Sequence, residues 1–276
     1  MLQPSVRVSG IILGSHSLDE SRDVRGRSRS SYLDSETETI NVNGKLPQVV
    51  LLPGMDGTGE LFADFIAAVS GEFETKVVRY STDICQSYLE LAGLIRAGAP
   101  ADAPFVLVAE SFSSPLAIYY AAMKPSNLKG LVLCAGFAST PVRGWKRLVV
   151  SILAPIAFRF MLPNFVCKLL LIGPDAPASL VAAVRSAVSS VRPDVLWVRL
   201  RTLLACDFRA DLAQVDLPIL YVQAEQDRLV DASCLREILR IKPETSVIAI
   251  PGPHLLLQKE PVQMAKIVAG FVANLK

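Results

Sequence analysis

The pattern of hydrophobic and polar positions changes near residue 46. From there on, short apolar runs that end in glycine, proline or polar residues alternate with longer stretches of helical spacing. Strands that are apolar at nearly every position are typical of a parallel sheet buried on both faces. The runs that predict such strands are QVVLLPG, TKVVRY, FVLVAES, LKGLVLCAG, PILYVQAEQD and TSVIAIPG. The alternation predicts an α/β fold with a mostly parallel central sheet.

Helices are predicted between these strands, where apolar residues recur every three or four positions. They cover residues 59–70, 84–97, 112–124, 232–241 and 261–275. Pro125 ends the third helix, and Pro261 lies in the first turn of the last, where proline is tolerated. These helices are expected to flank the sheet.

The alternation is interrupted between residues 137 and 216, which contain helical apolar stretches but no convincing buried strand. We predict that this segment is a helical cap, or lid, inserted into a core made of residues 46–136 and 217–276. An insertion at this point of the chain is expected to cover the carboxyl ends of the strands.

Within this segment, residues 149–173 are apolar over a length that could span a bilayer. Two charged residues and two prolines interrupt them, namely Arg159, Lys168, Pro155 and Pro163. Charges are costly inside a membrane, so an apolar lid is expected here rather than a stable membrane span.

Residues 1–45 form a different region, predicted to be a polar and flexible leader. Residues 15–38 are rich in serine, arginine and acidic residues, a composition that cannot bury a core. The weak alternation of residues 37–44 is compatible with one edge strand. No apolar segment with a preceding positive charge and a cleavage site is present, so a secretory signal is not expected.

Composition narrows the class of protein further. The chain has 276 residues, of which 51% are hydrophobic, and a formal net charge of only +2, with no basic stripe that would indicate a nucleic-acid partner. Its 5 cysteines are scattered singly, without metal-ligand spacing. We expect reduced thiols in a cytoplasmic protein, no metal and no cofactor.

One predicted strand ends in polar residues that could take part in catalysis. In FVLVAESFSS the apolar run stops at Glu110 and Ser111, where the chain must turn sharply into a helix. A serine on such a turn projects its hydroxyl beyond the carboxyl edge of the sheet, where functional groups gather, and the following backbone N–H groups point the same way. Ser111 is therefore a candidate nucleophile. The alternative is that this serine, with Ser113 and Ser114, only caps the helix.

A serine nucleophile needs a base. The chain has 2 histidines, and only His254 follows a predicted strand, in VIAIPGPHLLLQ. A carboxylate should hold its imidazole. Asp227 ends the preceding strand in ILYVQAEQD and is the candidate, while Asp231 and Glu225 are nearby rivals.

The order Ser111, Asp227, His254, each after a predicted strand, resembles that of α/β-hydrolases. The resemblance extends over residues 46–276 and includes LLPGMDGTGELF, which is similar to the glycine-rich loop after an early strand of that family. It implies an oxyanion hole formed by the backbone N–H groups of Met55 and Phe112. By itself, the glycine-rich segment would also suit any tight turn.

The sequence departs from the family pattern at the turn around the serine. The family has G-x-S-x-G, whereas Ala109 and Ser113 replace both glycines here. Both replacements are small, and we expect the turn to accept them at some cost in strain.

The resemblance implies a serine carboxylesterase that hydrolyses small acyl esters of short to medium chain length through an acyl-enzyme. Two alternatives stay open at this point. The same triad would serve a thioesterase or a lipid acyltransferase, and the fold also supports non-catalytic binding proteins.

Overall fold

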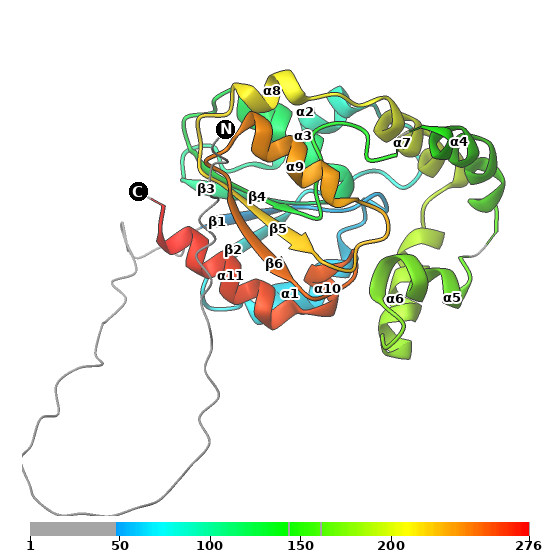
Figure 1. Ribbon diagram of the computed structural model, residues 1–276. Helices are drawn as coiled ribbons and strands as arrows, with labels where there is room; N and C mark the ends of the chain where they lie inside the picture. Colours follow the sequence, from blue (N-terminus) through cyan, green and yellow to red (C-terminus); the bar gives the residue numbers. More distant parts are fainter. Residues whose placement is uncertain (1–47, 143, 161, 276) are drawn as a thin grey trace, which may run out of the picture. The chain divides into compact units, whose positions relative to one another are not determined.

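The computed structural model describes residues 48–142, 144–160 and 162–275 (Figure 1). The predicted leader, including the edge strand expected at residues 37–44, lies outside these residues.

A six-stranded sheet with strand order β2-β1-β3-β4-β5-β6 forms the centre of the described chain, and all neighbouring strands are parallel (Figure 1). In chain order the strands are β1 (Gln48–Leu52), β2 (Glu74–Val77), β3 (Phe105–Glu110), β4 (Leu128–Cys134), β5 (Ile219–Ala224) and β6 (Ser246–Ile250). The prediction of a parallel α/β fold is confirmed. Because all the strands are parallel, the carboxyl ends of β3, β5 and β6 lie along one edge of the sheet.

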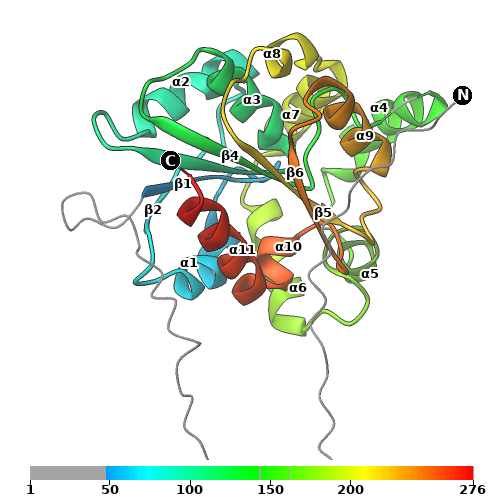
Figure 2. The same cartoon turned by 60° about the vertical axis from the view of Figure 1, so that its left-hand side comes forward.

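Each face of the sheet has its own hydrophobic core. On β1, Val49 and Leu51 face one core while Val50 and Leu52 face the other, as the two-residue repeat of a strand requires. Helices α1 (Ala63–Ala68), α10 (Leu256–Lys259) and α11 (Pro261–Ala273) cover the first face (Figure 2). Helices α2 (Tyr88–Gly98), α3 (Ser114–Ala122), α8 (Arg209–Ala213) and α9 (Ala232–Ile241) cover the second.

Some helix boundaries differ from the prediction. Helix α2 begins at Tyr88 rather than at residue 84, because Ser87 caps it: the Ser87 side chain accepts from the Glu90 N–H, and the Glu90 carboxylate accepts from the Ser87 N–H. Such a reciprocal cap fixes a helix start more strongly than apolar periodicity does. Before α3, residues Ser111–Ser113 form the 3₁₀ turn η2. The short helix α10 was not predicted.

Residues 137–216 hold helices and one isolated bridge, between Ser139 and Asp207, but no strand among the residues that the structure describes there. The helices are α4 (Trp145–Ala157), α5 (Asn164–Val166), the π-helix η3 (Cys167–Ile172), α6 (Ala178–Ser189), α7 (Pro193–Ala205) and α8. Across residues 48–275, apart from the undescribed 143 and 161, no helix combines the length and apolarity needed to cross a membrane.

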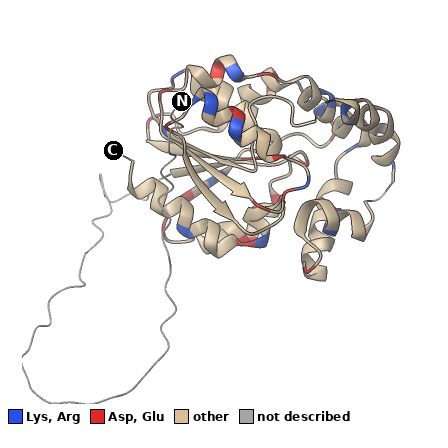
Figure 3. Cartoon of the chain, viewed as in Figure 1, with Lys and Arg blue, Asp and Glu red and all other residues tan. Residues whose placement is uncertain are grey.

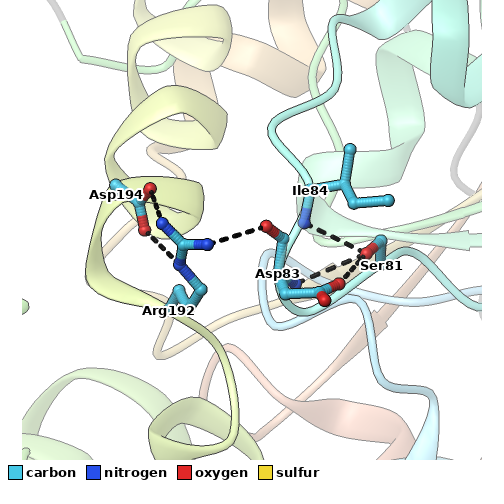
Figure 4. A network of polar contacts seen from close by, with 5 residues as sticks. All are labelled: Ser81, Asp83, Ile84, Arg192 and Asp194. Carbon is cyan, nitrogen blue, oxygen red and sulfur yellow. Dashed lines mark hydrogen bonds and ion pairs between the residues drawn. The ribbon is translucent and has the colours of Figure 1, made fainter.

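Arg192, just before α7, ties this helical segment to the loop after β2 (Figure 4). Its guanidinium pairs with Asp194 at 2.7 Å and donates to the backbone carbonyl of Asp83 at 3.4 Å. The Arg192 N–H also donates to the carbonyl of Thr82 at 2.9 Å. In the same loop, the Ser81 hydroxyl donates to the Asp83 carboxylate and accepts from the Ile84 N–H. The loop therefore has a fixed shape where it faces α7.

Candidate active site

Ser111 lies on the sharp turn between β3 and α3. Its φ angle is +48°, in the left-handed region that residues other than glycine rarely adopt. The flanking Ala109 and Ser113 are fully buried. A strained backbone of this kind persists only where the surroundings hold it, and such strain is concentrated at functional sites.

Three side chains hold the turn in place. The Ser113 hydroxyl donates to the carbonyl of Pro53, in the loop after β1. Because that hydroxyl has a single proton, the Tyr80 hydroxyl, 2.6 Å away, donates to it. The Tyr88 hydroxyl donates to the Phe112 carbonyl at 3.0 Å. Ser113, which replaces the second glycine of the family pattern, thus links the turn after β3 to the loop after β1.

Ser111, His254 and Asp227 lie in hydrogen-bond contact. The distance from His254 Nε2 to Ser111 Oγ is 2.8 Å, and that from His254 Nδ1 to Asp227 Oδ2 is 2.7 Å. The His254 and Asp227 side chains are only 3% and 4% exposed. With the ring proton on Nδ1, where the carboxylate accepts it, Nε2 accepts the hydroxyl proton of Ser111.

The second oxygen of Asp227 is also bound. Asp227 Oδ1 accepts the backbone N–H groups of Leu229 and Val230, at 2.8 and 2.9 Å. These bonds fix the carboxylate plane, so that Oδ2 is directed at the imidazole. The rival Asp231 instead caps α9 by accepting the Ser233 N–H at 2.8 Å. Glu225, the other rival, has an exposed side chain.

The loop expected to supply half of an oxyanion hole lies beside the turn. Leu52 is paired with Ala109 in the sheet, so the chain leaves β1 next to the end of β3. A Cβ atom built on Gly54 would lie 3.6 Å from the Glu110 carboxylate. Met55 and Phe112 therefore belong to neighbouring loops at the end of the sheet that carries Ser111.

Comparison with known proteins identifies the family of the chain. Residues 75–251, well over half of the chain, match the protein family described as serine aminopeptidase, S33. The chain belongs to this family. It is therefore a member of the α/β-hydrolase superfamily, which the resemblance had predicted.

Solved structures of similar fold are numerous. A hydrolase from Oleispira antarctica has a TM-score of 0.73 at 13% identity, over 83% of this chain and 91% of that one. The enol-lactonase from Burkholderia xenovorans LB400 has a TM-score of 0.70 at 15% identity, over 84% and 93%. The esterase RhEst1 from Rhodococcus sp. ECU1013 has a TM-score of 0.68 at 17% identity, over 84% and 92%. At such identities the likeness concerns the fold alone. A search of curated proteins gave no match.

The sequence of this α/β-hydrolase did not point to Arg199, a buried arginine of α7 that contacts the glycine-rich loop. Its side chain is 2% exposed and donates to the carbonyls of Met55 at 2.9 Å, Asp56 at 2.6 Å and Ser81 at 2.6 Å. Its guanidinium carbon also lies 5.7 Å from the centre of the Tyr80 ring. Arg199 thereby fixes the glycine-rich loop from the side of the helical segment. The sequence contained one indication that Arg199 is buried, since the helical spacing places it on the same side of α7 as Val195, Leu196 and Leu203.

We expect Arg199→Met to lower the free energy of unfolding by on the order of 3 kcal/mol, because buried carbonyls would lose their donor. Urea denaturation measures this loss. Arg201→Met, at an exposed position of the same helix, is the matched control and should change stability little. Equal effects of both substitutions would contradict the role given to Arg199.

Glu110, next to the candidate nucleophile, is a buried carboxyl group. It is 2% exposed, and its Oε2 accepts from the Gln258 amide at 3.2 Å. Among the described residues, its Oε1 has no hydrogen-bond partner. Burial raises the pKa of Glu110 to about 8, the charge of Asp56 adds to this, and the bond from Gln258 opposes it. Glu110 is therefore mostly protonated at neutral pH.

This pKa predicts a pH dependence of stability. Between the ordinary value of 4.5 and about 8, the folded chain binds a proton at Glu110 that the unfolded chain has lost. The free energy of unfolding therefore falls as the pH rises through this window and levels off above it. Glu110→Gln removes the titration. We expect the variant to match the wild type near pH 5 and to exceed it by on the order of 3 kcal/mol near pH 9.

Urea denaturation of both proteins at the two pH values measures the difference. Glu72→Gln, at an exposed position, serves as the control and should leave the wild-type pH dependence intact. If Glu110→Gln and the wild type kept the same stability difference at both pH values, the buried-acid interpretation of Glu110 would be wrong.

Proposed function

We propose that this α/β-hydrolase is a serine hydrolase of carboxylic esters, with Ser111 as nucleophile, His254 as general base and Asp227 as the carboxylate that orients it. The observation that carries the proposal is the continuous hydrogen-bonded chain from Ser111 Oγ through both nitrogens of His254 to Asp227. A serine cap of α3 would need no such chain. The family and the fold support a hydrolase as well.

The mechanism follows from the roles of these groups. Ser111 Oγ attacks the ester carbonyl while His254 Nε2 takes its proton, and Asp227 stabilises the imidazolium that forms. His254 then gives this proton to the leaving alkoxide, and the C–O bond of the ester breaks to leave an acyl-enzyme. A water molecule, deprotonated by His254, attacks the acyl-enzyme. The bond between the acyl carbon and Ser111 Oγ breaks, His254 returns its proton to Oγ, and the acid is released.

The oxyanion of each tetrahedral intermediate needs hydrogen-bond donors. We assign this role to the backbone N–H groups of Met55 and Phe112. The proposal is supported by the Ser113 bond to Pro53, which joins the two loops, and by the Arg199 bonds to Met55 and Asp56, which hold the glycine-rich loop. Each such donor typically contributes on the order of 100-fold or more to the rate.

We propose that the acyl group of the substrate is apolar and of short to medium length, because the segment beside the histidine loop is apolar. Leu255, the neighbour of His254, packs in a buried cluster with Cys167 and Ile172 of η3, and its N–H donates to the Leu171 carbonyl at 2.9 Å. The helical segment thus lies against the histidine loop with apolar side chains. We propose that residues 137–216 act as the cap of the active site.

A series of p-nitrophenyl esters from acetate to palmitate tests the proposal. We expect the highest kcat/KM for the short and medium chains, and best turnover of palmitate would contradict that range. Amino-acid p-nitroanilides test for the peptidase activity in the family's description. Added alcohols test for acyl transfer, since an acyltransferase would form the new ester in preference to the acid.

A further inference from the structure

Helix α4 exposes a large apolar face. Its exposed residues include Trp145 (73%), Leu148 (65%), Ile152 (58%) and Ile156 (58%). These four positions have the spacing i, i+3, i+7 and i+11, which places them on one side of a helix. Val149 and Leu153 are exposed beside them. The helix therefore carries an apolar face that no described part of the chain covers.

The opposite side of α4 is the one that attaches the helix to the protein. Val150 and Ala154, together with Phe158 just after the helix, pack against the main core, and α4 lies against α7. The helix is thus held by one apolar side and presents a second one outward. A helix that only packed a lid onto the core would need the first side alone.

Further large apolar side chains are exposed in the residues that follow α4 in the chain. Phe160 is 71% exposed, Phe165 is 69% exposed and Leu169 is 49% exposed. Exposed aromatic and aliphatic side chains at this density are rare on monomeric proteins and mark surfaces that contact a partner or a membrane.

The charged residues of α4 and of the turn that follows it are all basic, namely Lys146, Arg147 and Arg159. Between Ser111 and Pro174 the sequence contains no aspartate or glutamate. Arg147 and Arg159 are exposed. In the ribbon of Figure 3, α4 carries basic (blue) but no acidic (red) residues. The neighbouring α7 does contribute Asp194, but its carboxylate is paired with Arg192.

The apolar face and its charges distinguish between two partners that could cover it, a second copy of the chain and a lipid bilayer. If a second copy of the chain covered the face about a two-fold axis, the basic end of one face, with Arg159, would meet another surface that has no carboxylate on α4 to pair with it. The surface of an anionic bilayer supplies an apolar interior for the apolar side chains and a negative charge for Arg159. Tryptophan, as at position 145, prefers this boundary between lipid and water.

We propose that the apolar face of α4, formed by Trp145, Leu148, Ile152 and Ile156, docks onto the surface of an anionic phospholipid bilayer. The helix lies in the plane of the interface, with its apolar side chains among the upper acyl chains and Arg159 at the headgroups. Docking in this manner is peripheral and reversible. It does not depend on the proposed ester hydrolysis.

Vesicle binding of the full chain tests the proposal. We expect association with vesicles of equimolar phosphatidylcholine and phosphatidylglycerol, weaker association with pure phosphatidylcholine, and release at high salt. In a Trp197→Phe protein, Trp145 is the sole tryptophan, since the chain has 2. Its emission should shift to the blue on binding, and brominated lipids should quench it.

Substitutions locate the contact. Ile152→Ser with Ile156→Ser should weaken vesicle binding about 100-fold, or about tenfold for each apolar side chain removed. Leu89→Ser with Val262→Ser is the matched control, because these residues of α2 and α11 are 65% and 60% exposed elsewhere. Arg159→Gln should reduce the preference for anionic vesicles while the apolar face stays intact. Circular dichroism checks that each variant is folded.

Three results would overturn the proposal. One is an unchanged Trp145 emission with anionic vesicles. Another is equal weakening by the control pair at Leu89 and Val262. The third is a dimer, seen by sedimentation, that the Ile152 and Ile156 substitutions dissociate without any vesicle binding by the wild type. Because binding is measured without a substrate, a failure here is distinct from a failure of the esterase proposal.

Discussion

Replacement of Ser111 by alanine is expected to lower the kcat for p-nitrophenyl butyrate by roughly 10⁴- to 10⁶-fold. The reason is chemical, because without Oγ no acyl-enzyme can form and His254 has no proton to take from position 111. A fluorophosphonate probe, which reacts covalently with activated serines, should label the wild type and leave the variant unlabelled.

The matched control is Ser114→Ala, three residues further along the same turn and helix. Ser114 is fully buried, and its hydroxyl has no hydrogen-bond partner among the described residues. Its removal should therefore leave both folding and turnover nearly unchanged. A folded Ser111→Ala protein that kept wild-type turnover would refute the assignment of the nucleophile.

Asp227→Asn is expected to reduce kcat about 10⁴-fold with little change in structure. The N–H groups of Leu229 and Val230 need an acceptor, so they should hold the amide oxygen of the asparagine in the place of Oδ1. The amide NH₂ then faces His254 Nδ1. The imidazole must accept there and carry its proton on Nε2, where it can no longer take the proton of Ser111.

Steady-state kinetics of Asp227→Asn beside Asp231→Asn check this expectation. Asp231 caps α9, so its substitution should cost about 1 kcal/mol of stability or less and spare activity. Loss of activity in Asp231→Asn with activity retained in Asp227→Asn would assign the orienting carboxylate to Asp231 instead.

The strands were predictable because parallel strands, buried on both faces, leave long apolar runs in the sequence. Helix starts were less predictable, as at Ser87, because a cap set by two side chains overrides apolar spacing. The places of Ser111, Asp227 and His254 could be predicted for a related reason. Each follows a strand run, and the carboxyl ends of parallel strands meet along one edge of the sheet.

The sequence by itself therefore determined the fold class, the family resemblance and which residues could meet at the end of the sheet. Only the tertiary structure decided that Asp227 rather than Asp231 or Glu225 contacts His254, since that depends on loop geometry at the scale of a hydrogen bond. It also decided that Arg199 reaches Met55, 144 residues earlier in the chain. Finally, the apolar spacing of α4 in the sequence does not indicate which of its sides is buried and which is exposed. Packing alone left Trp145 and Ile152 facing outward.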